Sequence, residues 1–484
     1  MQSLLILSLL STIITPLNDA SKAPRGVDTL VIYNWQDYIN EGLDEDGNKV
    51  TTSLLEDFQS WYKIEYGNDI KITYNTFETN ETMMNNLMTG KSHYDLVCPS
   101  DYALQKMIKK DMLIKLDIDE NNQYTNVPNY NQYGSPYIKN LFIEKGWNEY
   151  SIPYMWGTMG LMYDPSVVNE EDVSSWNVMW DTNYQKKISI KDSVRDTYFT
   201  GVLRAYMDEL EVIMADYESS KISVEEYNAK ITEIFNRCDD ETLELVEIEL
   251  KALKRNIYGL EVDSGKNDIV TGKIAMNLAW SGDAVYSLDL AETENNKHLK
   301  YSVPKEGSNI WFDAWAMPKG ANKKTAQAFL NFLSIPEYAA KNMEYIGYTS
   351  VIAGDEILAL VKDWYYEEDG EYSVDLGYFF DGTLKGEDQD TVIKVSELNR
   401  QFSAQYPSEE TIARCAIMED FGDQTTKVLA MWESFKSNTI SPMVYVSVTI
   451  MFGTLIFGYV FFKVKKYRNK KRRLERYKNN KANI

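Results

Sequence analysis

One stretch near the C-terminal end divides the chain into parts of different character. Residues 437–462 carry no charged side chain, and the 21 residues from Pro442 to Phe462 are mostly apolar. A helix of that length would extend roughly 30 Å, which matches the apolar core of a bilayer. The alternative is a helix buried in a protein core. Because the length and the lack of charge suit a bilayer, we expect a single transmembrane helix over 442–462.

The tail that follows this stretch, residues 463–484, is strongly basic. It contains eleven Lys or Arg and one acid, Glu475. Basic residues beside a membrane span stay in the cytoplasm, so the tail is predicted to be cytoplasmic and the preceding body to face outward. The membrane span accounts for the position of these charges better than a nucleic-acid-binding role does.

The N-terminal end carries a shorter apolar run. Leu4–Leu17 has the length of the apolar region of a signal peptide and is too short to span a bilayer. No Lys or Arg precedes it, no Cys follows it for lipid attachment, and Ala20 and Ala23 are candidate cleavage positions. We interpret residues 1–26 as an export or anchoring segment.

Composition excludes several classes of function for the body. Without the tail, residues 1–462 carry a formal charge of −33, which disfavours nucleic-acid binding. Such acidity is typical of a solvated surface and also compatible with a cationic ligand. With only His93 and His298, histidine-based catalysis and multi-histidine metal sites are disfavoured. Three Cys and no CxxC argue against a disulfide framework or a thiolate zinc cluster. We expect no cofactor and no metal.

The body of about 410 residues alternates strands and helices. Short strands are predicted at Thr29–Asn34, Ile70–Tyr74 and Tyr94–Cys98, with helices between them. This alternation predicts a parallel α/β sheet, whose ligands bind at the carboxyl ends of the strands. The acidic, periodic region 207–263 predicts two or three amphipathic surface helices.

Local signals predict where several helices begin. Capping boxes are predicted at Ser53 with Glu56 and at Ser334 with Glu337, and Asn80 is predicted to cap a short helix. Gly90-Lys91-Ser92 does not complete a phosphate-binding loop, because the required glycine is absent and the tripeptide follows a helix. No HExxH, GxSxG or EF-hand pattern is present, and no spacing singles out a catalytic pair of carboxylates.

Aromatic residues recur beside acids at the predicted strand ends. A ring beside a carboxylate suits an alkylammonium ligand, because the ring face attracts the cation and the carboxylate accepts its hydrogen bonds. The alternative is that these rings are core or surface packing. The groups are Trp35 and Tyr38 around Asp37, Tyr102 after Asp101, Trp280 near Asp283, and Trp311 and Trp315 around Asp313.

These segments, read in order, resemble the polyamine (spermidine/putrescine) substrate-binding proteins of ABC importers. The resemblance covers about residues 29–436 and is weaker across 207–263 and 362–405. The matching stretches are YNWQDYI (33–39), FETNETM (77–83), YDLVCPSDYALQKM (94–107), SIPYMWGTMGLMYD (151–164), IAMNLAWSGDA (274–284), VPKEGSNIWFDAWAMPKGA (303–321) and AFLNFLSIPEYA…IGYTS (328–350).

The resemblance implies a type II periplasmic-binding-protein fold, with two α/β lobes that clamp a ligand between them. SIPYMWG and the stretch before WFDAWAMP would be the crossing segments. Lobe one would comprise 28–150 and 311–357, and lobe two 151–310 and 358–436, with 207–263 as an acidic helical elaboration. The protein would perform no chemistry: its closed form would be recognised by a membrane permease that works with a separate ATPase subunit.

The resemblance also implies a set of ligand-binding residues. Trp35 and Tyr38 would line the ligand-binding site, and Asp196 would bind an ammonium group of the ligand. Either Asp192 or Ser193 would stand beside Asp196, because the first acid of the family's loop has no direct counterpart here. The remaining positions are Ser100, Tyr102, Trp280, Trp311, Asp313 and Tyr348.

Three rival hypotheses remain at this stage. A receptor of the same fold could bind another small solute, because the acidic loop and the region near Met418 depart from the family pattern. A surface-anchored hydrolase would use two of the acids, although no nucleophile or histidine constellation supports it. An adhesin or structural ectodomain would need only the anchor and the acidic body.

Overall fold

The computed structural model describes residues 26–44, 47–90, 92–382 and 390–437, together with Tyr459 and Lys463. Apart from these single residues and Gly26, the predicted transmembrane helix, the basic tail and the N-terminal segment lie outside the described residues. Within the described ranges, no helix is both long enough and apolar enough to cross a bilayer. The chain divides into two compact units, residues 1–428 and 429–484, and the first contains the fold described below apart from the end of the last helix, which lies in the second.

The first half of the body alternates strands and helices as predicted. Its elements are β1 (Asp28–Trp35), α1 (Leu54–Tyr66), β2 (Ile70–Phe77), α2 (Asn80–Thr89) and β3 (Leu96–Val97). β1 pairs in parallel with both β2 and β3, which confirms parallel pairing for these three strands, whereas the sheet as a whole is mixed because β9 and β4 pair antiparallel with their neighbours. β3 is shorter than the predicted strand over 94–98: Leu96 and Val97 pair with β1, and Val97 also pairs with Ala316 of β9.

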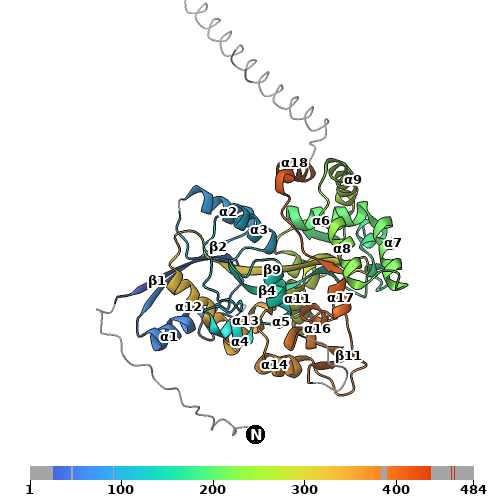
Figure 1. Ribbon diagram of the computed structural model, residues 1–484. Coiled ribbons are helices and arrows are strands. Elements are labelled where there is room, and N and C mark those ends of the chain that lie inside the picture. The colour runs from blue at the N-terminus through green and yellow to red at the C-terminus, as the bar shows by residue number, and fades with distance from the viewer. Residues whose placement is uncertain are drawn as a thin grey trace, which may run out of the picture. The chain divides into compact units, whose positions relative to one another are not determined.

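Two long strands join the two halves of one sheet (Figure 1). β4 (Ser151–Tyr163) is buried along its whole length. It pairs antiparallel with β9 (Ser308–Ala316) up to Thr158 and then with β7 (Met276–Trp280) from Met159 onward. The main strand order is β2-β1-β3-β9-β4-β7-β5-β6, where β5 is Ile188–Lys191 and β6 is Gly259–Glu261. Both segments that the resemblance gives as crossings therefore lie on this central pair.

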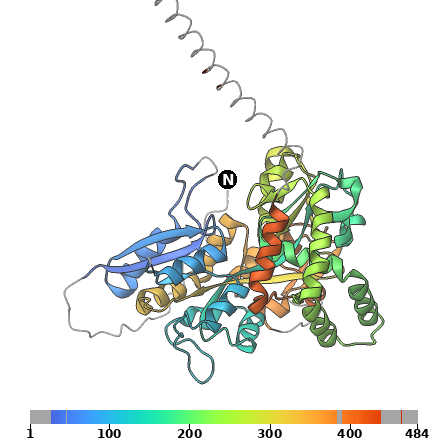
Figure 2. The ribbon, with the colours of Figure 1, turned by 90° about the horizontal axis from the view of Figure 1, so that it is seen from above.

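The second half carries a thick helical layer, drawn in green in Figure 2. The region 207–263 forms three helices, α7 (Met207–Glu218), α8 (Val224–Phe235) and α9 (Asp240–Asn256), which confirms the prediction of two or three. α9 packs against α6 (Val194–Ala205), and α7 packs against α8. Acids occupy the first turn of each of these three helices, where they oppose the positive end of the helix dipole.

The predicted helix caps were partly wrong. The capping box of Ser53 and Glu56 is confirmed. The cap of α2 is Thr79, one residue before the predicted Asn80, whose side chain instead reaches Tyr102 and Ser100. No capping box forms at Ser334: its hydroxyl donates to the Leu330 carbonyl at 2.8 Å, because Ser334 still caps the end of the preceding helix.

The other elements complete the two halves. The helices are α3 (Asp101–Lys109), α4 (Pro128–Tyr133), α5 (Pro136–Glu144), α10 (Gly265–Val270), α11 (Ser281–Asn295), α12 (Lys323–Leu333), α13 (Pro336–Ile346), α14 (Asp355–Tyr365), α15 (Gly377–Phe380), α16 (Gln401–Gln405), α17 (Glu409–Ala413) and α18 (Thr425–Lys436). The remaining strands are β8 (Lys300–Ser302), β10 (Thr349–Ser350), β11 (Tyr372–Asp375), β12 (Val392–Val395) and β13 (Cys415–Ala416). Short 3-10 turns lie at Asp172–Ser174, Trp176–Trp180, Thr182–Tyr184 and Gly422–Gln424.

The stretch 358–436 contacts both halves. α16 packs against α11 of the second half, whereas α15 packs against α5 of the first. The Ser135 hydroxyl donates to the Phe379 carbonyl at 2.7 Å. The predicted division of the lobes at residue 357 stays a prediction.

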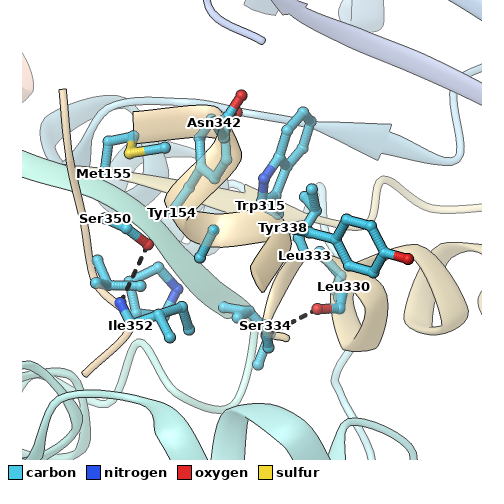
Figure 3. A pocket seen from close by; sticks show the side chains of 14 residues that line it. Tyr154, Met155, Trp315, Leu330, Leu333, Ser334, Tyr338, Asn342, Ser350 and Ile352 are labelled. Carbon is cyan, nitrogen blue, oxygen red and sulfur yellow. Dashed lines mark hydrogen bonds between the residues drawn. The ribbon is translucent and has the colours of Figure 1, made fainter. Parts of the chain in front are cut away.

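The core beside the crossing strands is closely packed. Figure 3 shows a small pocket beneath β4, with Tyr154, Trp315, Leu330 and Asn342 among its walls. Its volume is about 10 Å³, room for about one water molecule. Trp315 is 1% exposed and packs against Tyr154, so this ring belongs to the core, although the sequence had marked it as a candidate beside Asp313.

The close approach of the halves at β4 predicts a sensitive position. A Cβ atom at Gly157 would lie 2.2 Å from the Ser281 hydroxyl oxygen and 2.8 Å from the Trp311 ring. We expect Gly157→Ala to lower the free energy of unfolding of the full chain by about 1–3 kcal/mol in urea denaturation. The matched control is Gly259→Ala in β6, where a Cβ meets no atom within 4 Å and the change should stay within about 0.5 kcal/mol. Equal stability of the two variants would contradict the packing argument.

Candidate functional site

A buried carboxylate stands on the central strand β9. Asp313 is 7% exposed, and its Oδ2 accepts a hydrogen bond from the Tyr38 hydroxyl at 2.8 Å. Its Oδ1 has no hydrogen-bond partner in the part of the chain that the structure describes. Burial raises the pKa of Asp313 to about 6 against the opposing hydrogen bonds of Ser100 and Tyr38, and the negative charge of Asp196 raises it further. Asp313 is thus a carboxylate with unsatisfied capacity to bind a cation.

Aromatic rings from distant segments surround this carboxylate. Tyr38 lies just after β1, and Tyr348 lies between α13 and β10. The rings of Tyr38 and Tyr348 meet edge to face, with centroids 4.9 Å apart. The Trp311 ring lies 5.7 Å from that of Tyr348, and its indole Nε1 is buried with no hydrogen-bond partner among the described residues. Three predicted rings therefore lie around Asp313.

The second half of the sheet brings Trp280 to the same junction. Trp280 ends β7 and precedes α11, and Ser281 follows it directly. The Ser281 hydroxyl and the Trp311 ring both crowd the backbone of Gly157. Gly157 of β4 is the register partner of Trp311. The amide of the next residue, Thr158, donates a hydrogen bond to the Ser281 hydroxyl at 3.3 Å. β4 therefore places the end of β7 and the start of α11 beside β9.

The loop of predicted acids begins α6. Ser193 is the N-cap, and its hydroxyl accepts a hydrogen bond from the Asp196 amide, while Asp192 is half-buried. Asp196 is 7% exposed. Burial raises its pKa, whereas the hydrogen bonds of Ser193 and Trp280 lower it, and the effect of burial is the larger one. Its charge acts on Asp313, so the acids of the two halves are close enough to interact.

Ser100 and Tyr102 lie at the start of α3. Ser100 forms a backbone bridge with Asp313, which places this N-cap next to the central carboxylate. The Tyr102 hydroxyl accepts from Asn80 at 3.0 Å and donates to Glu81 at 3.5 Å. Burial raises the pKa of Glu81, a half-buried acid that the sequence analysis did not select.

Trp35 is the last residue of β1, at the carboxyl end of the strand. Its ring packs on Phe77, with centroids 4.6 Å apart, and the two residues are register partners at the ends of β1 and β2. The indole Nε1 of Trp35 is buried without a partner among the described residues. Asp101 has a structural role: its carboxylate accepts from the Phe312 amide at 3.1 Å and from the Tyr102 amide at 2.6 Å.

The sequence analysis did not predict a buried ion cluster next to the Trp280 ring. The Lys191 ammonium lies 2.9 Å from Asp283 and 3.0 Å from Glu261. The other oxygen of Asp283 accepts from the Tyr348 hydroxyl at 2.8 Å. Burial opposes the charge on Lys191, but the two acids outweigh it and raise the pKa of Lys191 above its usual value. Asp283 had been noted only as a neighbour of Trp280, and its lysine partner stands 92 residues earlier in the chain.

Two pockets of the structure lie away from these residues. A pocket of about 620 Å³ is lined by residues of α11, α14 and α16, and none of the predicted site residues lines it or the small pocket of Figure 3. Among the described ranges, no group of His, Cys, Asp or Glu could hold a metal ion. The rings and acids around Asp313 are thus packed together in this conformation.

Known proteins resemble this chain in sequence. A putrescine-binding periplasmic protein, SpuD, of Pseudomonas aeruginosa is 32% identical over 322 residues, which cover 64% of this chain and 75% of the relative. A spermidine/putrescine-binding periplasmic protein of Salmonella typhimurium is 28% identical over 335 residues, 69% of this chain and 80% of the relative.

Solved structures resemble the fold. The spermidine/putrescine ABC transporter substrate-binding protein PotD of Streptococcus pneumoniae, in complex with calcium and HEPES, is 28% identical with a TM-score of 0.55. The match covers 84% of this chain and 98% of that one. A putative spermidine/putrescine ABC transporter of Listeria monocytogenes gives a TM-score of 0.58 at 25% identity, over 84% and 99% of the two chains.

These likenesses confirm the resemblance that the motifs indicated, and they confirm the two-lobe periplasmic-binding-protein fold. Residues 54–363 match the family described as bacterial extracellular solute-binding protein. The chain therefore belongs to the family of bacterial extracellular solute-binding proteins, whose members bind solutes and are not enzymes.

Proposed function

We propose that this protein captures a small polyamine, such as putrescine or spermidine, between its two lobes and delivers it to an ABC permease. The observation that carries the proposal is the Asp313 Oδ1, which has no hydrogen-bond partner among the described residues and is buried among Tyr38, Trp311 and Tyr348. An ammonium is the ligand that such a place favours, because the carboxylate pairs with its charge and the ring faces attract it. Relatives named for binding putrescine and spermidine support the same ligand class.

Several kinds of contact would contribute to the affinity of this site. Micromolar affinity needs about −8 kcal/mol. A cation over an aromatic face contributes about 0.5–2 kcal/mol, and a desolvated ammonium–carboxylate pair adds a charge-assisted hydrogen bond. The rings also cover the methylene groups between the amines. Trp280 and Asp196 in the second half would hold the far end of the ligand.

Binding at this site needs the lobes to separate. Asp313 and Trp311 are each less than a tenth exposed, so a ligand from solution can reach them only when their surroundings move apart. Closing again removes water from the ammonium and strengthens its pairing with the carboxylate. The closed form is then the state that a permease would recognise, with a separate ATPase subunit supplying the energy.

We also propose that the body is held at the outer face of the membrane. The uncharged segment 442–462 would span the bilayer, and the basic tail 463–484 would stay in the cytoplasm. An anchored receptor stays near its permease, which makes capture and delivery local events. Residues 1–26 would direct export.

The first test removes the charge of the central carboxylate. We expect Asp313→Asn to weaken putrescine or spermidine binding at least tenfold in calorimetry of the full chain, with little change in melting temperature because Asn can still accept from Tyr38. The matched control is Asp37→Asn, an exposed acid near Tyr38 whose positive φ of 52° Asn also tolerates. If Asp313→Asn binds as the wild type does, Asp313 is not an ammonium partner. Binding of a sugar in place of amines would reject the ligand class.

The second test uses pH. Asp313 must be ionised to pair with an ammonium, and its pKa is raised from about 4 to about 6 by burial. Amine affinity should therefore be constant above pH 7 and fall as the pH drops below 6, by about tenfold at pH 5. Asp313→Asn should lose most of this dependence. A wild-type affinity that is the same at pH 5 and pH 7.5 would contradict the role of Asp313.

The third test addresses orientation. Protease added outside intact cells should digest the body and leave the basic tail intact, because the membrane shields residues on its cytoplasmic side. Antibodies against each part, used after digestion, measure the outcome. A detergent-treated sample, in which both parts are cut, is the control. Protection of the body would overturn the orientation.

A further inference from the structure

The second half of the junction contains a cation of its own. Lys191 is the last residue of β5, and its side chain is 1% exposed. Its ammonium lies 4.3 Å from the centroid of the Trp280 ring, within the range of a cation–π contact. It also pairs with Asp283 and Glu261. One cation position at Trp280 is therefore already taken by the protein.

The positive charge of Lys191 also reaches the predicted ammonium-binding acid. Lys191 and the buried Arg195 both lower the pKa of Asp196, opposing the effect of its burial. Their effect means that Asp196 is partly balanced by protein cations before any ligand arrives. Asp313 differs, because Asp196 is the charged neighbour that acts on it and its Oδ1 has no hydrogen-bond partner among the described residues. The two ends of the site are thus electrostatically unequal.

We infer that Lys191 is a specificity-determining residue that disfavours a second ligand ammonium at the Trp280 and Asp196 end. This inference rests on the proposed function. The site would hold one ammonium tightly at Asp313 and receive the other end of the ligand beside a fixed like charge. Adding a second amine to an alkylamine then improves binding less than it would in a site without Lys191.

The test compares two ligands that differ by one amine. The affinities of putrescine and n-butylamine for the full chain are measured by calorimetry, and their ratio reports the benefit of the second ammonium. Lys191→Met combined with Glu261→Gln removes one charge of each sign and leaves Asp283 with Lys266, 4.0 Å away. We expect this double variant to raise the preference for putrescine over n-butylamine at least fivefold. Lys191→Arg, which keeps the charge, should keep the wild-type ratio.

A matched control exists on the surface of the same half. Lys273 pairs with Asp268 at 2.9 Å and lies 5.1 Å from the centroid of the Tyr258 ring, so it has the same kinds of partner. Lys273→Met with Asp268→Asn should leave the ratio within twofold of the wild type. If the Lys191 double variant does not unfold cooperatively on heating, Lys191→Gln replaces it, because Gln can still donate to the buried acids and carries no charge.

The outcomes separate the two proposals. An unchanged or reduced ratio in the neutral Lys191 variant, with n-butylamine still bound, overturns the role of Lys191 and leaves the proposed function standing. Absence of binding of both amines and of spermidine to the wild type overturns the proposed function and this inference together. A raised ratio that appears equally in the Lys273 control also overturns the role of Lys191.

Discussion

The antiparallel pairing of β4 with β9 is the interaction on which the rest of this structure depends. β4 is a single strand of 13 buried residues that belongs first to one half of the sheet and then to the other. Along this path its backbone pairs with β9, β7 and β8, and at the junction the Ser281 hydroxyl accepts the hydrogen bond of the buried Thr158 amide. The side chains of Asp313 and Trp311 owe their positions to their places on β9. The same pairing sets Trp280 beside them, because β7 begins its pairing with β4 where β9 leaves it.

Around this junction, buried charge is handled in two ways. Lys191 pairs with both Asp283 and Glu261, at distances of 2.9 and 3.0 Å, and this attraction offsets part of the cost of removing the charges from water. Asp313 has a tyrosine hydroxyl on one oxygen and no hydrogen-bond partner for the other among the described residues. A fold that satisfies one cluster completely and leaves the neighbouring carboxylate incomplete is consistent with selection for a ligand at that carboxylate.

Sequence reasoning reached the fold through local signals and ordered motifs. The alternation of strands and helices was sufficient to predict the parallel pairing of β1, β2 and β3, but not the antiparallel pairs of β4 and β9 at the centre of the sheet. The periodicity of 207–263 predicted its helices. The capping box predicted at Ser334 was wrong because Ser334 ends α12 and the next helix begins only at Pro336. A four-residue pattern does not show that the preceding helix extends this far. Nearly all contacts of the site join residues far apart in the chain, such as Tyr38 with Asp313. The family resemblance predicted which of these distant residues belong to one site, whereas the sequence pattern alone predicted only that aromatic rings stand next to acids. Lys191 was missed because both its acids are distant in sequence.

The three helices α7, α8 and α9 have an effect that reaches beyond packing. Each presents acids in its first turn, and they lie on the half of the body that carries Asp196 and Trp280. A cation diffusing in dilute salt is drawn toward such a surface from a distance, which raises the frequency of productive encounters. At an ionic strength of about 0.1–0.15 M, salt screens this attraction beyond a distance of about 8–10 Å. Under the proposed function, capture of a cationic ligand would then slow as the salinity of the surroundings rises, while the affinity of the enclosed site would change much less.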